Sequence, residues 1–222
     1  MDYEVINQAV RQINGLHESV SEDHFGNMSK NKIWNLKSKR IDDVLEDSKI
    51  FEEFENYVDE YRSKLNFVVA YSEFIDDYSK FDGRNRVKQK DSIQNKLFYY
   101  QSKKSTNHGK VPLQKCLNDL LGFRLVFNDF YPDEPEFCKL ITSLKKDLNL
   151  MNCFPSNKEG YKGYHIYFKN GKNQFFPWEL QVWNTEDVRN NEKAHRKHDA
   201  KRKYIEWPKQ YEEGILRKGD DA

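Results

Sequence analysis

The stretch Phe176-Pro-Trp-Glu-Leu-Gln-Val-Trp183 decides the fold, because apolar and polar side chains alternate along it. Successive side chains of a β-strand point to opposite faces, so this alternation is typical of a strand with one buried face. The two faces carry Phe176, Trp178, Leu180 and Val182 on one side, and Glu179, Gln181 and Trp183 on the other. The pattern predicts a strand with a core on its apolar side and a polar surface opposite.

Two stretches upstream alternate in the same way. They are Phe123–Phe127 and Tyr164–Phe168, each with a polar residue between apolar ones. If the three strands share one buried face, their polar side chains converge on the opposite face. The side chains that would meet there are Arg124, His165, Glu179 and Gln181. That face would carry a cation, an imidazole, a carboxylate and an amide.

Helices are expected on either side of these strands. Apolar residues three and four apart predict a long helix from Asp47 to Lys80, opened by an Asp47-Ser48 cap. Residues 2–14 predict a short amphipathic helix, and residues 15–32 a loop. The other expected elements are helices over 91–104, with an Asp91-Ser92 cap, over 135–148 and over 185–204, a strand near 150–154 and a loop over 155–163.

At 222 residues the chain is long enough for one structural domain with a substantial core. The fold class we expect is α+β (mixed α/β), with a central mixed β-sheet of about five strands flanked by helices and an N-terminal helical segment. Within it, residues 1–82 would form a helical region that packs on a core of residues 83–205, and residues 206–222 a tail.

Composition excludes several classes of protein. Charged residues make up 33% of the chain, and no apolar run is long enough to span a bilayer. The acidic start Met1-Asp-Tyr-Glu is no signal peptide, so a cytoplasmic protein without a membrane partner is expected. Cys116, Cys138 and Cys153 are odd in number and scattered, which favours reduced thiols over a disulfide framework or a zinc site.

A basic run precedes the first of the alternating strands. Arg86, Lys88, Ser92 and Lys96 start in a loop and enter a helix, where Ser92 and Lys96 share one face. A helix N-terminus with converging cations is a natural cradle for phosphate. The alternative is a solvated basic helix start.

Two carboxylates could join this cradle. Asp119 lies just before one alternating strand and Glu179 lies on the polar face of another, and two such carboxylates can hold one Mg²⁺ together with phosphate oxygens. The alternatives are a turn residue for Asp119 and an exposed strand charge for Glu179. Tyr161, in the glycine-flanked loop before His165, is placed to stack under a base.

These motifs, in this order from about Arg86 to Tyr204, resemble the synthetase domain of the RelA/SpoT family, which has a nucleotidyltransferase-like fold. The resemblance implies that Arg86, Lys88, Ser92 and Lys96 bind ATP, and that Arg124 stacks on its adenine with Arg86. It also implies that Asp119 and Glu179 hold Mg²⁺ as the cofactor. Asp119, Arg124 and Glu179 are then the catalytic residues, and Glu179 is the activator of the attacking hydroxyl.

On the acceptor side, the resemblance implies that Tyr161 stacks on the acceptor base, that His165 contacts acceptor phosphate and that Gln181 accompanies Glu179. The reaction implied is ATP-dependent transfer of pyrophosphate to a ribose 3′-hydroxyl, with AMP leaving. The sequence departs from the family at Gly163, where a serine is usual, and at Trp183, where an arginine is usual.

The length and these departures resemble the toxin branch of the small alarmone synthetases, whose members modify the 3′ CCA end of tRNA and inhibit translation. This resemblance implies a toxin-antitoxin system with a neutralising antitoxin protein, and it leaves open whether the chain forms a homo-oligomer. The alternatives are an alarmone synthetase that uses GDP or GTP as acceptor, and a catalytically silent module that binds RNA or protein.

Two basic segments fit a tRNA partner. The residues we expect to contact tRNA are Lys30, Lys32, Lys37, Lys39, Arg40, Arg196 and Lys197. The alternatives are solvated helix faces or the docking of an acidic protein. His195 and His198 have no third ligand nearby, which argues against a metal pair.

Overall fold

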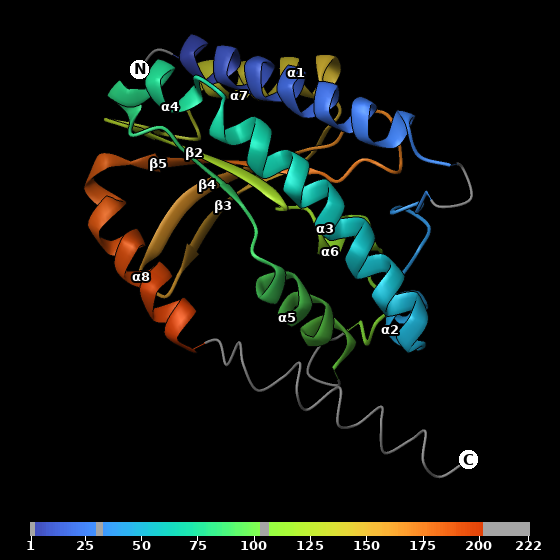
Figure 1. The fold of residues 1–222 in the computed structure, drawn as a ribbon. Coiled ribbons are helices and arrows are strands. Elements are labelled where there is room, and N and C mark those ends of the chain that lie inside the picture. Colours follow the sequence, from blue (N-terminus) through green and yellow to red (C-terminus); the bar gives the residue numbers. More distant parts are fainter. Residues whose placement is uncertain (1–2, 30–32, 103–106, 202–222) are drawn as a thin grey trace.

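The computed structural model describes residues 3–29, 33–102 and 107–201, drawn in colour in Figure 1. The residues expected to form the C-terminal tail, 206–222, lie outside the described part. Within that part no helix combines the length and the apolar character needed to cross a membrane.

One mixed β-sheet of five strands forms the centre of the molecule, in the order β1-β2-β5-β4-β3. The β2–β5 pair is parallel, and the other neighbouring pairs are antiparallel. The strands are β1 (Arg84–Val87), β2 (Leu121–Phe127), β3 (Leu150–Lys158), β4 (Tyr161–Phe168) and β5 (Trp178–Asn184). Helices flank this sheet, so the predicted fold class is confirmed.

The helices surround the sheet on several sides (Figure 1). The α-helices are α1 (Glu4–Gly26), α2 (Asp42–Leu45), α3 (Ser48–Ala70), α4 (Phe74–Asp77), α5 (Lys90–Gln101), α6 (Leu113–Cys116), α7 (Pro135–Asp147) and α8 (Val188–Lys201). Two short 3₁₀ helices, η2 and η3, cover Ser79–Phe81 and Thr185–Asp187.

Aromatic side chains join α1, α3 and α7 to the apolar face of the sheet. Tyr61 of α3 stacks on Phe176 at 5.3 Å between ring centroids, and Phe137 of α7 meets Tyr164 of β4 edge-on at 5.0 Å. Phe25 of α1 packs against Tyr61. Burial of these large rings supplies much of the hydrophobic stabilisation and leaves the opposite face of the sheet for polar side chains.

Strand register places the predicted polar residues next to one another. The parallel pairing sets Gly122 beside Glu179 and Arg124 beside Gln181, and the antiparallel pairing sets His165 opposite Gln181. Because these residues are all in register on adjacent strands, the candidate side chains lie within reach of one another.

The first helix is longer than expected. It runs through Gly15 to Gly26, so the predicted end near residue 14 and the loop over residues 15–26 are wrong. Glycine costs a helix interior about 1 kcal/mol relative to alanine. The second half of α1 buries Val20 and Phe25, and this tertiary packing outweighs the local preference.

The long helix is shorter than expected. Asp47 does cap it, accepting hydrogen bonds from the backbone of Lys49 at 2.8 Å and Ile50 at 3.0 Å. It ends at Ala70, whereas the spacing predicted Lys80. The chain then forms α4 and η2, so the apolar residues beyond Ala70 belong to two short helices and not to α3.

The predicted loop over residues 155–163 is also wrong. Strand β3 continues to Lys158 and β4 begins at Tyr161, so the two form a hairpin. Its turn residues Glu159 and Gly160 have φ values of 52° and 85°, in the left-handed region that suits a two-residue hairpin. Tyr161 is therefore the first residue of a strand rather than part of a loop.

Candidate active site

A cavity of about 280 Å³ opens on the polar face of the sheet. Its walls include Arg86, Arg124, Glu179, Gln181 and Trp183, and α8 closes one side with Glu192 and His195. The predicted polar residues of the sheet thus gather at one pocket. His165 does not line it but contacts Glu179, which does.

Asp119 joins two lysines beside this pocket. Its Oδ2 accepts from Lys88 Nζ at 2.7 Å and its Oδ1 from Lys96 Nζ at 2.9 Å. Burial alone would raise the pKa of Asp119, but Lys96 and Lys88 overcome it and hold that pKa well below its usual range. The ionised cluster carries two cations and one anion, so it has a positive charge left to attract phosphate.

The other members of the basic run lie nearby. Lys96 follows Ser92 by one turn of α5, and Ser92 lies in the first turn of that helix. The side chain of Arg86 is 50% exposed, with Nη2 3.8 Å from Glu179 Oε2. A Cβ at position 122 would come within 3.3 Å of Arg86 Nε, so Gly122 leaves room for the guanidinium to lie over the sheet.

The start of α5 differs from the prediction. The helix begins at Lys90 with Gln89 at its N-cap, and no side chain caps it. The expected Asp91-Ser92 cap is therefore wrong. The first-turn N–H groups of α5, which include that of Ser92, have no partners within the helix, so a phosphate could accept hydrogen bonds from them.

Glu179 lies at the centre of a hydrogen-bond network, only 3% exposed. Its Oε1 accepts from His165 Nδ1 at 2.7 Å and its Oε2 from Gln181 Nε2 at 2.8 Å. Burial raises the pKa of Glu179, and the hydrogen bond and charge of His165 reverse the shift, so the pKa lies below its ordinary value. The buried carboxylate is ionised and fully hydrogen-bonded, as a buried charge must be.

The two carboxylates fit a magnesium ion. Asp119 and Glu179 are close enough for each to influence the other electrostatically, and both supply the hard oxygen ligands that Mg²⁺ prefers. Among the described residues no group of three or more His, Cys, Asp or Glu could hold a metal. Asp119 and Glu179 could supply two ligands to such an ion, with water and substrate phosphate as its other ligands.

A chain of donors runs from β5 back to this carboxylate. Trp183 Nε1 donates to the Tyr161 hydroxyl at 3.1 Å, and that hydroxyl lies 2.8 Å from His165 Nε2. When His165 is neutral and donates from Nδ1 to Glu179, its Nε2 accepts from Tyr161; when His165 is protonated, Nε2 donates to the Tyr161 hydroxyl, which can donate to Gln181 Oε1 at 3.3 Å. In both arrangements the hydrogen bonds hold the imidazole ring between Tyr161 and Glu179.

Tyr161 is more enclosed than a loop tyrosine would be. Its ring meets Trp183 and His195 edge-on, at centroid distances of 5.7 Å and 5.4 Å. Burial raises the pKa of its hydroxyl, which stays protonated as a donor. The location of Tyr161 next to His165 and Gln181 follows from strand pairing, which the glycine-flanked motif did not reveal.

Arg124 is held by groups that the sequence did not point to. Its Nη1 bonds Glu192 at 2.9 Å and its Nη2 bonds Asp82 at 3.0 Å, while its Cζ lies 4.2 Å from the centre of the Trp183 ring. The one available signal for Glu192 was its spacing of three residues from His195 on the same helix.

The residues expected to bind tRNA do not line this pocket. Lys37, Lys39 and Arg40 are exposed on the segment before α2, and Arg196 is exposed on α8. The guanidinium of Arg40 donates to the Lys110 carbonyl. Lys30, Lys32 and the side chain of Lys197 lie outside the described part of the chain.

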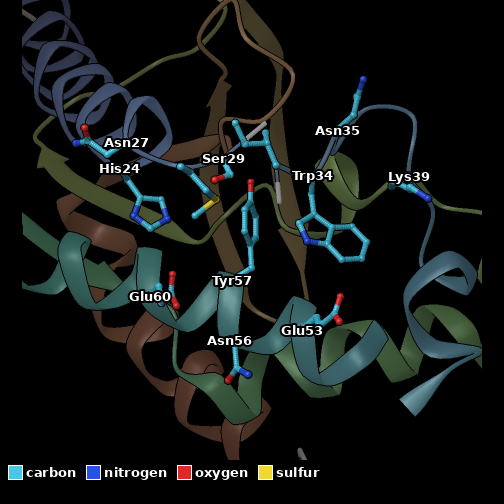
Figure 2. Close-up of a pocket in the computed structure, with 12 residues that line it drawn as sticks. His24, Asn27, Ser29, Trp34, Asn35, Lys39, Glu53, Asn56, Tyr57 and Glu60 are labelled. Atoms are coloured by element: carbon cyan, nitrogen blue, oxygen red, sulfur yellow. The ribbon is translucent and has the colours of Figure 1, made fainter. Parts of the chain in front are cut away.

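A larger cavity, of about 960 Å³, lies elsewhere. It is formed by the end of α1, the middle of α3 and the segment after Ile33, with His24, Trp34 and Tyr57 around it (Figure 2). Of all the residues expected to function, only Lys39 lines it. We therefore place the candidate active site at the smaller pocket, where the motifs meet.

No protein-family model and no curated protein matches this chain. Among solved structures, a GTP pyrophosphokinase family protein from Streptococcus pneumoniae is similar at 19% identity and a TM-score of 0.42, over 77% of this chain and 89% of that one. Small alarmone synthetase 1 from Bacillus subtilis, bound to its product pppGpp, is 21% identical with a TM-score of 0.37, over 69% of this chain and 80% of that one.

The same Bacillus subtilis protein bound to AMPCPP is similar at 18% identity and a TM-score of 0.33, over 78% of this chain and 94% of that one. These neighbours come from the family that the motifs resemble. At such identities and TM-scores they carry no argument about function, which rests on the residues and geometry of this chain.

Proposed function

We propose that this protein is an ATP-dependent pyrophosphokinase that transfers pyrophosphate from ATP to a ribose 3′-hydroxyl. The observation that carries the proposal is the pair of buried, ionised carboxylates, Asp119 held by Lys88 and Lys96, and Glu179 held by His165 and Gln181. A buried pair of this kind beside surplus cations suits a metal-bound polyphosphate.

The donor half of the site binds the triphosphate. Lys88 and Lys96 contribute positive charge, Arg86 lies at the mouth of the pocket, and Ser92 belongs to the first turn of α5. Arg124 presents a planar guanidinium for the adenine. Magnesium held by Asp119 and Glu179 would act as a Lewis acid on the β-phosphoryl group.

The acceptor half activates the hydroxyl. The 3′ oxygen forms a bond to the β-phosphorus, the bond from that phosphorus to the α-phosphate oxygen breaks, and AMP leaves. The hydroxyl proton passes to the carboxylate of Glu179, whose orientation His165 and Gln181 maintain. Charge that develops on the transferred group is met by Lys88, Lys96 and Arg86.

The acceptor we propose is the 3′ CCA end of tRNA, so that the protein inhibits translation as a toxin and requires a neutralising antitoxin. Gly163 and Trp183 support this choice, because they replace the polar and cationic residues that guanine-nucleotide acceptors meet in the resembling family. The exposed cations Lys37, Lys39 and Arg196 suit RNA phosphates. GDP or GTP is the alternative acceptor.

A labelling experiment separates these possibilities. The protein is incubated with γ-labelled ATP and Mg²⁺, together with either total tRNA or GDP and GTP. Label in tRNA supports the tRNA acceptor, and label in a guanine nucleotide supports an alarmone synthetase. If neither acceptor takes up label, both enzymatic functions are wrong and a silent binding module is left. Growth arrest on expression in cells is the matching observation for a toxin.

A further inference from the structure

The cavity of about 960 Å³ beside α1 and α3 is separate from the candidate active site, since the two share no described lining residue. Glu53, Tyr57 and Glu60 follow one another on α3 at spacings of four and three, so they share one face of the helix and line the cavity. His24 comes from the last turn of α1, and Trp34 from the segment before α2 (Figure 2).

Two buried polar groups in this cavity have no partner in the described part of the chain. Tyr57 is 5% exposed and His24 6%, and neither the Tyr57 hydroxyl nor His24 Nε2 makes a hydrogen bond there. The Trp34 backbone N–H approaches the Tyr57 oxygen, but a donor cannot take the phenolic proton. Leaving buried polar groups unmet is costly, so water or a ligand in the cavity completes them.

The protonation states of these groups are set by burial. Burial raises the pKa of the Tyr57 hydroxyl, which therefore remains a donor in need of an acceptor. Burial, together with the charge of Lys64, lowers the pKa of His24, so its ring is neutral at pH 7. The cavity thus offers an unused phenolic donor beside an uncharged imidazole.

The walls favour a flat ligand over water alone. The indole of Trp34 is half-buried and meets Phe54 edge-on at 5.1 Å and Tyr57 at 6.4 Å with a tilt of 56°, so neither ring stacks on it face to face. An indole beside a cavity is a platform for a planar ring, and such stacking is a strong contact for a nucleobase.

Charge narrows the class of ligand further. The charged lining residues that the structure describes are Glu53, Glu60 and Lys39, two carboxylates against one ammonium, which disfavours a phosphate. Carboxylates accept readily from hydroxyl and amino groups. A guanidinium or ammonium ligand has no acceptor for Tyr57, whereas an uncharged nucleoside has ring acceptors, donors and ribose hydroxyls.

We propose that this cavity is a binding site for an uncharged nucleoside. The base stacks on Trp34, accepts from the Tyr57 hydroxyl and bonds His24 Nε2. Glu53 and Glu60 accept from the remaining hydroxyl or amino groups. The volume lies in the range of small-molecule sites, about 300–1,000 Å³. The inference goes beyond the proposed function and does not depend on it.

Isothermal titration calorimetry without ATP tests the site, with adenosine, guanosine, cytidine and uridine as probes. The wild type should bind at least one of them, and a saturating concentration should raise the melting temperature, because the ligand joins α1 to α3. Tyr57→Phe should weaken that binding by about three- to tenfold and Trp34→Ala by about tenfold or more. The 5′-monophosphate of the same nucleoside should bind at least about threefold more weakly.

Tyr61→Phe is the matched control. Tyr61 lies one turn further along α3, its hydroxyl bonds Ser21 at 2.7 Å, and it does not line the cavity. Without ligand, Tyr61→Phe should lower the melting temperature, whereas Tyr57→Phe should not, since the Tyr57 hydroxyl has no acceptor in the described part of the protein. With ligand, Tyr61→Phe should keep the wild-type affinity.

Four results would overturn the proposal. They are binding of none of the four nucleosides, an affinity that Tyr57→Phe leaves unchanged, an equal loss in Tyr61→Phe, and a monophosphate that binds as tightly as its nucleoside. The second result also covers adenosine that enters the candidate active site instead. If Trp34→Ala fails to fold because Trp34 packs on Phe54, Tyr57→Phe still decides, since it keeps the ring and removes only the hydroxyl.

Discussion

Lys88 Nζ lies 2.7 Å from Asp119 Oδ2, and the two side chains are only 8% and 14% exposed. Burial lowers the pKa of Lys88 while Asp119 raises it, so the two groups depend on one another to remain charged. Lys96 binds the other carboxylate oxygen of Asp119. The cluster of Lys88, Lys96 and Asp119 therefore carries a net positive charge although its side chains are mostly buried. A triphosphate and its metal can exchange partners with this cluster without creating an unpaired buried charge.

Asp119→Asn should therefore damage stability as well as activity. The substitution leaves Lys88 and Lys96 as buried cations without a carboxylate, and loss of one partner of a buried ion pair typically costs about 3–5 kcal/mol. Urea unfolding would measure the loss, and the labelling assay the expected absence of transfer. Asp76→Asn, exposed on α4, is a matched control that should lose far less; equal losses in the two variants would contradict the cluster's role.

Stability should also depend on Asp119 in acid. The pKa of Asp119 is depressed in the folded state from its ordinary value of 3.8, so its contribution is fully present above pH 3.8 and is lost as the pH falls further. The wild type should destabilise more steeply than Asp119→Asn below this pH. If the free energy of unfolding of the two proteins falls equally as the pH drops below 4, the ion pairs of Asp119 do not make the proposed contribution.

His17 provides a second, separate dependence on pH. Burial of its ring against Tyr61 lowers its pKa from 6.5 to about 4. Because the unfolded chain binds a proton at His17 more readily than the folded protein does, the folded state loses stability as the pH is lowered from 6.5 to 4. The free energy of unfolding should fall by about 3 kcal/mol over this range. Chemical denaturation at several pH values checks this, with His17→Gln expected to flatten the slope.

Glu179→Gln should abolish transfer while ATP still binds. The substitution keeps the shape of the side chain but removes the charge that holds the metal and accepts the proton, so the rate should fall by about 10²–10⁴-fold or more. Labelling gives the rate, and equilibrium binding of ATP the affinity. Glu186→Gln, on the exposed 3₁₀ helix η3, is the control and should keep full activity. Normal turnover by Glu179→Gln would exclude its assigned role.

Replacement of Lys37, Lys39 and Arg40 together by Ala should weaken tRNA modification and reduce its dependence on salt. Exposed cations bind RNA by releasing counterions, so each lost phosphate contact flattens the plot of log affinity against log salt. A triple Ala variant of the exposed Lys139, Lys145 and Lys146 of α7 is the control. If both triple variants show the wild-type salt dependence, the RNA surface lies elsewhere.

Removal of Mg²⁺ should stop transfer without unfolding the protein. The fold buries its own core and its carboxylates are hydrogen-bonded by protein groups, so circular dichroism should be unchanged after EDTA treatment. Activity should return when Mg²⁺ is added back. Transfer that persists in EDTA would contradict the roles proposed for Asp119 and Glu179.

Much of the site could be predicted from residue patterns. Alternation in β2, β4 and β5 assigned Arg124, His165 and Glu179 to one face, since a strand has a fixed period of two residues. Local patterns failed at α1, which runs through Gly15, and at Tyr161, which begins a strand. There the deciding contacts come from residues far away in sequence, and local propensity is weaker than packing.

By itself the sequence determined which side chains face the core and which face the pocket, because pleat geometry depends only on neighbours along the chain. Tertiary structure decided which strands pair, and hence that Gln181 lies between Arg124 and His165. It also brought Gly163 against Trp183, a contact between two strands that depends on register and available volume. Periodicity is local, whereas register and close packing are properties of the assembled sheet.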